Sequence, residues 1–256
     1  MNIILIGSDG AMGKVIRTLS PDLHHHVVMG LQAHPSDESD IIIATTFEEL
    51  DSKMSQLTNK ADVIIDFSTP KLTDALLEFA VNHKLPIMLA TTGQTAEQEA
   101  LIEEAAQHIA IIDAHNTSIG VNVMERIVEQ MTSILSPLGY DIEIIEKHHR
   151  YKIDSPSGTA KMLLDAVEKG MEVDPTIIYG REGNDTQRSS KEVGVHAIRG
   201  GDIVGEHTVL FANNQEVLEL THRAGSKELF ARGAISAAEF LTQQEQAGIY
   251  SMNDIF

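Results

Sequence analysis

The spacing of hydrophobic positions changes about halfway along this chain of 256 residues. In the first half, short apolar runs alternate with segments whose apolar residues recur at helical spacing. The runs predict buried strands at residues 2–7, 27–31, 62–67, 86–90 and 110–113. The segments between them predict helices at residues 12–19, 70–83 and 95–108. Strands that alternate with helices indicate a parallel sheet with helices on its faces, a Rossmann-like α/β unit.

Beyond residue 118 the pattern becomes that of an α+β unit. Helices are predicted at residues 121–135 and 157–169, and strands at residues 141–146, 176–179, 193–198, 204–211 and 217–221. The turn signals Gly200-Gly201-Asp202 and Asn213-Asn214 separate the last three strands, which indicates a mainly antiparallel sheet. A final helical pattern at residues 227–243 could return to the first unit.

The charge of the chain is strongly acidic, with 38 acidic and 19 basic side chains and a net charge of -19. Such a surface repels phosphate backbones, so we expect no nucleic-acid partner and no anionic membrane surface. No apolar run reaches the roughly 20 residues that a membrane helix needs. The absence of cysteine excludes disulfides, cysteine–zinc sites and a thiol nucleophile. We expect a cytoplasmic protein without a metal site, and interpret His24-His25-His26 as a solvated loop.

A glycine-rich loop follows the first predicted strand and opens the first predicted helix. It reads Gly7-Ser8-Asp9-Gly10-Ala11-Met12-Gly13, a G-x-x-G-x-x-G variant of the dinucleotide fingerprint. Glycine lets the backbone approach a pyrophosphate, and the N–H groups of a helix N-terminus attract phosphates. We therefore predict that Gly7 to Met12 bind a dinucleotide. A plain tight turn is the alternative.

Two further loops follow predicted strands and could line the same crevice. They read Ala90-Thr91-Thr92-Gly93 and Ala114-His115-Asn116-Thr117-Ser118. Ligands of open α/β sheets bind at the carboxyl ends of the strands, which is where both loops are expected. Ordinary loops or helix caps are the alternative.

The residue that usually reads the ribose hydroxyls of a dinucleotide is missing. An acidic residue is expected at the end of the second strand, where this chain reads Leu31-Gln32-Ala33-His34-Pro35 and has no carboxylate before Asp37. No arginine or lysine stands there to hold a 2′-phosphate. The sequence therefore leaves NADH and NADPH equally open as the cofactor.

The local charge reverses between residues 147 and 152. Lys147, His148, His149, Arg150 and Lys152 place five potentially cationic side chains within six residues. Lys152 could hold a carboxylate or deliver a proton, and a histidine beside it could act as a general acid. Each residue alone is more often a solvated surface group, but their joint occurrence indicates a site for an anionic substrate.

The segment Pro156-Ser157-Gly158-Thr159 opens the next predicted helix. Ser157 is a good N-cap, and Gly158 and Thr159 would present backbone N–H groups to an anion. This helix start suits a carboxylate, although a simple cap is the alternative.

These residues carry a resemblance to a known family. Glu146 to Thr159 matches every fixed position of E-x-H-H-x-x-K-x-D-x-P-S-G-T, the signature of the dihydrodipicolinate reductase family of bacterial and plant lysine synthesis. Further similar segments extend over nearly the whole chain: Met12-Gly13, Thr91-Thr92-Gly93, Asn116 to Asn122, Ile198-Arg199-Gly200-Gly201 and Gly205-Glu206-His207.

The resemblance implies an NAD(P)H-dependent oxidoreductase that reduces a small dicarboxylate, 4-hydroxy-tetrahydrodipicolinate, to tetrahydrodipicolinate in lysine and diaminopimelate biosynthesis. It implies a dinucleotide-binding domain at residues 1–118 and 227–256, a substrate-binding and oligomerisation domain at residues 119–226, and a homotetramer. It implies that His148 and Lys152 transfer protons. The implied substrate-binding residues are His149, Ser157, Gly158 and Thr159, and the implied cofactor-binding residues are Gly7, Ser8, Asp9, Gly10, Ala11, Met12, Ala90, Thr91, Thr92, Ala114, His115, Asn116 and Thr117.

Two alternatives stay open from the residues themselves. One is another NAD(P)H-dependent reductase of an imino or keto acid, and the other is a non-catalytic dinucleotide-binding protein. The chain also departs from many members of the family at Gln32-Ala33-His34, where they carry an acidic residue. This departure bears on the choice of cofactor.

Overall fold

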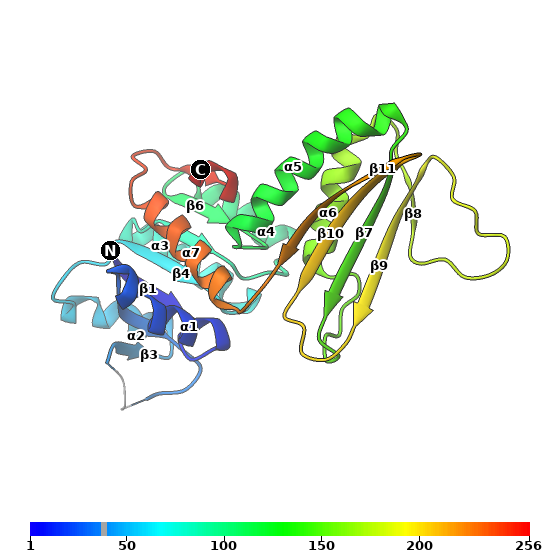
Figure 1. Ribbon diagram of the computed structural model, residues 1–256. Helices are drawn as coiled ribbons and strands as arrows, with labels where there is room; N and C mark the ends of the chain where they lie inside the picture. The colour runs from blue at the N-terminus through cyan, green and yellow to red at the C-terminus, as the bar shows by residue number, and fades with distance from the viewer. Residues whose placement is uncertain (37–39) are drawn as a thin grey trace. The chain divides into compact units, whose positions relative to one another are not determined.

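The computed structural model describes residues 1–36 and 40–256, which form two compact units. The first unit contains Met1–Ile119 and Lys227–Phe256, and the second contains Gly120–Ser226. The chain therefore leaves the first unit once and returns to it near the C-terminus (Figure 1).

The first unit is built on a seven-stranded sheet in which every pairing is parallel. Its order is β12-β6-β5-β4-β1-β2-β3. The strands are β1 (Asn2–Ile6), β2 (His26–Leu31), β3 (Ile42–Ala44), β4 (Val63–Asp66), β5 (Ile87–Leu89), β6 (Ala110–Asp113) and β12 (Gly248–Tyr250). Strands buried on both faces need apolar residues at consecutive positions, as at Ile3–Ile6 of β1.

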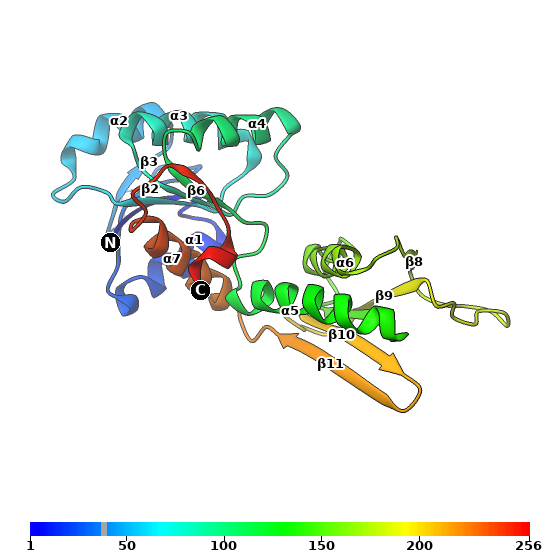
Figure 2. The ribbon, with the colours of Figure 1, turned by 90° about the horizontal axis from the view of Figure 1, so that it is seen from above.

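Helices cover both faces of this sheet (Figure 2). On one face lie α2 (Phe47–Lys53), α3 (Thr73–His83) and α4 (Ala96–Ala105), and on the other lie α1 (Ala11–Leu19) and α7 (Glu228–Leu241). Ile4 and Ile6 of β1 pack toward the first set, whereas Ile3 and Leu5 pack toward the second. The predicted Rossmann-like class is confirmed. The hydrophobic pattern did not predict β3 or β12, because three-residue strands give no readable period, and it did not predict the seven-residue helix α2, which spans only about two turns.

The second unit is a five-stranded sheet with α5 (Ile119–Leu135) and α6 (Gly158–Gly170) in its core. Its order is β11-β10-β7-β9-β8. The strands are β7 (Asp141–His148), β8 (Thr176–Ile178), β9 (Glu192–Arg199), β10 (Glu206–Asn213) and β11 (Glu216–Arg223). Short 3₁₀ segments lie at η1 (Pro21–Leu23), η2 (Met54–Gln56), η3 (Pro70–Leu72), η4 (Ser136–Leu138) and η5 (Met252–Ile255).

The antiparallel pairing predicted for the second unit holds for β11, β10 and β7. The turn at Asn213-Asn214 joins β10 to β11 as a hairpin, as predicted. The turn at Gly200-Gly201-Asp202 does not form a hairpin, because β7 lies between β9 and β10 in the sheet. As a result β9 runs parallel to both β7 and β8, so the sheet is mixed.

Strand β7 brings two polar side chains into the core of the second unit. Its residues alternate between partly exposed and buried, and Ile142, Ile144, Glu146 and His148 share the buried face. Because the first two pack in the hydrophobic core, the strand carries Glu146 and His148 to the edge of that core.

The structure bears on the metal site and the membrane helix considered above, within the residues that it describes. Within residues 1–36 and 40–256, no group of three or more His, Asp and Glu side chains is arranged to hold a metal ion. In that same part, no helix is long and apolar enough to cross a bilayer. His25 of the histidine run instead lies 3.2 Å from the N-terminal amino group through its Nδ1.

Candidate active site

The glycine loop at the end of β1 is shaped by close backbone contacts. Gly7 has a φ of +81°, and a Cβ at this position would lie 2.5 Å from the Phe67 carbonyl oxygen. A Cβ at Gly13 would lie 2.2 Å from the carbonyl oxygen of Gly7. Both positions therefore require glycine, because a side chain at Gly7 would push the loop away from the backbone of Phe67, and one at Gly13 would push α1 away from the loop.

The start of α1 fits a diphosphate. Gly10 is its N-cap residue and makes no side-chain capping bond, and both Gly10 and Ala11 are exposed. Asp9 and Met12 are partly exposed beside them. A helix start that lacks an anionic cap leaves its positive end to a bound anion. The residues present thus fit the pyrophosphate of a dinucleotide.

Ser8 has a different role from the rest of this loop. Its side chain is fully buried, and its Oγ donates to Gln32 Oε1 at 3.0 Å. Gln32 in turn donates through Nε2 to the His34 carbonyl oxygen at 2.8 Å. Gln32 therefore occupies the position after β2 where an acidic residue was expected, and both ends of its amide are engaged. Asp37 lies outside the described residues.

The other two predicted loops follow β5 and β6, at the same edge of the sheet as the glycine loop. Thr91 is buried and its Oγ1 accepts a hydrogen bond from the Ser68 amide at 2.9 Å. Thr117 is buried and donates to the Phe230 carbonyl oxygen at 2.8 Å. These two side chains hold the loops, while Thr92 and His115 are exposed and accessible to a ligand. Ala90 and Asn116 are partly exposed, and Ala114 is buried.

In the second unit, four nitrogen atoms from three residues converge on the buried carboxylate of Glu146. Its Oε1 accepts from Arg199 Nη2 at 2.8 Å and from the Ser157 amide at 3.0 Å. Its Oε2 accepts from Arg199 Nη1 at 2.7 Å and lies 2.6 Å from His148 Nδ1. Burial by itself would raise the pKa of Glu146, but the hydrogen bonds from Arg199, His148 and Ser157 outweigh it and hold the pKa below its ordinary value.

Ser157 and His148 also meet a second histidine, His207 on β10. Ser157 Oγ lies 2.9 Å from His207 Nε2 and accepts from the Ala160 amide at 3.2 Å, which caps α6. The rings of His148 and His207 stand edge to face with centroids 5.1 Å apart. Burial, followed by repulsion from His148, lowers the pKa of His207 to about 4. His207 is therefore neutral near pH 7.

The loop between β7 and α6 carries the predicted lysine. Lys152 Nζ donates to Asp154 Oδ1 at 2.8 Å, and this bond lowers the pKa of Asp154. Arg199 Nη2 donates to the Asp154 carbonyl oxygen at 2.8 Å and so ties the loop to β9. His149 is partly exposed, although its Nδ1 is buried without a hydrogen-bond partner in the described structure.

The start of α6 lies next to this loop. Gly158 is exposed and is the first residue of the helix, and a Cβ there would meet nothing within 4 Å. Thr159 is partly exposed beside it. The second unit thus gathers His148, Lys152, Ser157 and Gly158 at one end of β7.

Three members of this cluster were not predicted as site residues. Glu146, Arg199 and His207 all belong to segments that match the family, but no role was assigned to them. A signal existed for Glu146, because a carboxylate at an inward position of a predicted strand must find partners in the core. No comparable signal pointed to Arg199, because the sequence does not show that β9 pairs with β7 in the folded sheet.

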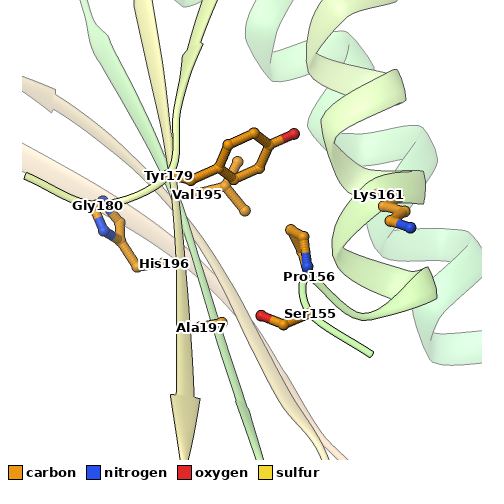
Figure 3. A pocket seen from close by; sticks show the side chains of 8 residues that line it. All are labelled: Ser155, Pro156, Lys161, Tyr179, Gly180, Val195, His196 and Ala197. Carbon is orange, nitrogen blue, oxygen red and sulfur yellow. The ribbon is translucent and has the colours of Figure 1, made fainter. Parts of the chain in front are cut away.

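A cavity of about 640 Å³ lies between α6 and strand β9 of the second unit (Figure 3). Tyr179 and Val195 line it on the sheet side, and Pro156 faces them from the loop. Among the described residues, neither His148 nor Lys152 lines this cavity.

The fold and these two sites define a class of protein. A parallel sheet with a glycine loop that fits a diphosphate, together with a unit that gathers histidine, lysine and an open helix start, is typical of a dinucleotide-dependent reductase of an anionic substrate.

Comparison with known proteins identifies the family. The model of the dihydrodipicolinate reductase N-terminus matches residues 1–117, and that of the C-terminus matches residues 120–256. A relative from Exiguobacterium, named 4-hydroxy-tetrahydrodipicolinate reductase, is 40% identical over all of this chain and 96% of its own length. A relative of the same name from Caldanaerobacter subterraneus is 39% identical over all of this chain and 98% of its own length. The chain belongs to the dihydrodipicolinate reductase family, a family of oxidoreductases, and the predicted resemblance is confirmed.

Solved structures support the fold. A dipicolinate-bound dihydrodipicolinate reductase from Paenisporosarcina matches with a TM-score of 0.80 at 18% identity, covering 99% of this chain and 98% of its own. An amine dehydrogenase from Mycobacterium smegmatis matches with a TM-score of 0.63 at 9% identity, covering 99% and 95%. At such low identities these likenesses show a shared fold.

Proposed function

We propose that the protein reduces 4-hydroxy-tetrahydrodipicolinate to tetrahydrodipicolinate with a nicotinamide dinucleotide, as a step of lysine and diaminopimelate synthesis. The observation that carries the proposal is the convergence of His148 and Ser157 on Glu146, with Lys152 on the loop that joins them. The proton-transferring ring, the cation and the helix start would together bind and protonate an anionic substrate.

The dianionic substrate would be held by charge and by backbone N–H groups. One carboxylate pairs with Lys152, and the other approaches the α6 start at Ser157, Gly158 and Thr159, with His149 beside it. Lys152 is bound to Asp154 in the structure, and the substrate would compete with that exposed carboxylate. Binding at two points orients the ring of the substrate.

The chemistry divides between cofactor and protein. A bound nicotinamide supplies the hydride, which adds to a conjugated carbon of the dehydrated substrate. The enamine that results needs a proton, which His148 would deliver directly, with Lys152 as the second proton donor. The protein contributes orientation and charge.

The cofactor is NADH or NADPH, held by Gly7, Asp9, Gly10, Ala11 and Met12 with the loops after β5 and β6. Gln32 supports the use of both, because its neutral amide neither repels a 2′-phosphate nor supplies a cation for it. Engineered D-amino acid dehydrogenase, a protein of similar fold with a TM-score of 0.58, has been solved with NADP+.

We further propose that the first unit binds the dinucleotide and that the second binds the substrate and forms a homotetramer in the cytoplasm. Val217 and Leu218 on edge strand β11 are 55% and 43% exposed, which supports a role of this sheet in assembly.

The reaction is tested by supplying the unstable substrate from the synthase that precedes it. Oxidation of NADH or NADPH that depends on the synthase, its substrates and this protein is the expected result. Reduction of other imino or keto acids alone would indicate a different reductase. Cofactor binding without any oxidation would indicate a non-catalytic dinucleotide-binding protein.

A further inference from the structure

We propose that Glu146, held by Arg199, is the positioning residue that fixes the tautomer and the direction of the His148 ring. The inference rests on the proposed function in one respect, that His148 is the group that transfers a proton. The geometry around Glu146 is independent of that role.

The protonation of Glu146 decides which nitrogen of His148 carries hydrogen. Three of the four nitrogens around the carboxylate, two from Arg199 and the Ser157 amide, can only donate, and they do so at 2.7 to 3.0 Å. The carboxylate stays ionised, and an ionised carboxylate only accepts hydrogen bonds. His148 Nδ1, at 2.6 Å, must therefore be the protonated nitrogen. Nε2 is left as the nitrogen that first takes up a proton from solvent and then delivers it to the substrate, while Nδ1 keeps its hydrogen bond to Glu146.

The space next to Nε2 is kept by a glycine. A Cβ at Gly205 would lie 3.1 Å from His148 Nε2, closer than side-chain carbons normally approach. On another side the edge-to-face contact with His207 confines the ring. His148 is 8% exposed, so the ring has little freedom to turn. Glu146 and Gly205 together set which edge of the ring can meet a substrate.

Arg199 makes this positioning rigid. Its two terminal nitrogens bind both oxygens of Glu146, which prevents the carboxylate from rotating. The guanidinium also offsets the charge of Glu146. Glu146 therefore acts on His148 mainly through the direction of a hydrogen bond and only secondarily through its charge.

The same strand offers a matched comparison in Glu143. This carboxylate accepts from both terminal nitrogens of Arg181 at 3.1 Å and lies 2.6 Å from His196 Nε2. Glu143 lies three residues before Glu146 and on the other face of β7. It therefore repeats the arginine–glutamate–histidine arrangement away from the predicted catalytic histidine.

The test replaces Glu146 by its uncharged isostere. In Glu146→Gln the amide oxygen is held by the Ser157 N–H, so the amide nitrogen faces His148 and donates to Nδ1. The hydrogen on the ring then moves to Nε2. We expect the ¹⁵N shifts of His148 to change from the Nδ1–H to the Nε2–H tautomer, and kcat to fall by about tenfold or more with a smaller change in KM. The His148 signal is assigned with His148→Gln.

The matched control is Glu143→Gln, which should leave both the His148 shifts and kcat unchanged. Glu146→Gln with the native tautomer and native kcat would overturn the inference, as would an equal loss of kcat in Glu143→Gln. If Glu146→Gln does not fold, Arg199→Lys serves instead. It keeps the buried pair of charges but loses the two-point contact, so kcat should fall while the protein stays folded, and an unchanged kcat overturns the inference.

A separate variant tests the proposed function. If His148→Gln retains full activity, His148 is not the proton-transferring residue. The tautomer measured in Glu146→Gln still decides whether Glu146 positions the ring.

Discussion

Ser157 Oγ and His207 Nε2 lie 2.9 Å apart in the interior of the second unit, so the residue that caps α6 is bonded to a histidine that stays neutral at neutral pH. The cap of the helix and the core of the sheet are thereby linked through one uncharged ring. This linkage has a consequence for stability in acid.

We predict that His207 makes the fold sensitive to acid. Its pKa is about 4 in the folded chain against an ordinary value of 6.5, so the unfolded chain binds a proton first as the pH falls. The stabilisation is complete above pH 6.5 and is lost progressively toward pH 4, by about 3 kcal/mol in all. Urea unfolding between pH 4.5 and 7.5 measures it. In His207→Gln the dependence on pH should be weaker by up to about 1.4 kcal/mol per pH unit, and an unchanged slope would contradict the assignment.

Lys152→Ala should lower turnover strongly and leave cofactor binding nearly intact. Lys152 lies in the second unit, among the residues proposed to hold and protonate the substrate, so its loss should reduce kcat/KM by about a hundredfold or more. Steady-state cofactor oxidation and NADH fluorescence titration separate the two effects. Lys147→Ala is the control, because Lys147 points to the other face of β7 and pairs with Glu206. Native rates in Lys152→Ala would refute its role.

Gly158→Ala should weaken substrate binding without harming the fold. A methyl group at this position meets nothing within 4 Å, so thermal unfolding should be unchanged. If a substrate carboxylate approaches the start of α6, however, the methyl group would obstruct it and raise KM by about tenfold. An unchanged KM would place the carboxylate elsewhere.

The native protein should use NADH and NADPH with comparable kcat/KM, because none of the described residues 32–36 after β2 is an acidic residue, an arginine or a lysine. A preference of about a thousandfold for either, roughly 4 kcal/mol, would show that another residue reads it.

Gln32→Glu should shift this balance toward NADH. The new carboxylate can still accept from Ser8 Oγ, but its charge would repel a 2′-phosphate and lower kcat/KM for NADPH by about tenfold. The ratio of kcat/KM for the two cofactors measures the change, and an unaltered ratio would show that residue 32 does not face the ribose.

Much of the fold could be predicted because its signals are local. The apolar runs gave β1, β4, β5 and β6 within one or two residues, since buried parallel strands need consecutive apolar positions. The pairing of β9 could not be predicted, because a turn signal does not say which strand lies across the sheet. The short strands β3 and β12 are held by pairing with neighbours rather than by their own pattern.

Some residues of the candidate site could likewise be predicted from local signals, and others could not. The spacing of the motif predicted His148, Lys152 and Ser157 as site residues, because they lie within ten residues of one another. Arg199 and His207 come from β9 and β10, and only the folded sheet places them beside Glu146. Ser8, Thr91 and Thr117 were predicted to bind cofactor, a role that stays a prediction. Their side chains are engaged within the protein, so any contact with a ligand falls to their backbone groups.

The return of the chain to the first unit sets the order in which the two units can fold during translation. Helix α7 covers one face of the parallel sheet with Ala231, Ala234, Ile235 and Ala238, and β12 pairs with β6 at its edge. Both follow residue 226, so a nascent chain carries a bare apolar face and an open strand edge until residues 227–256 have left the ribosome. The second unit is continuous and can close first. A ribosome that stalls late would thus release a protein with a finished substrate unit and an aggregation-prone dinucleotide unit.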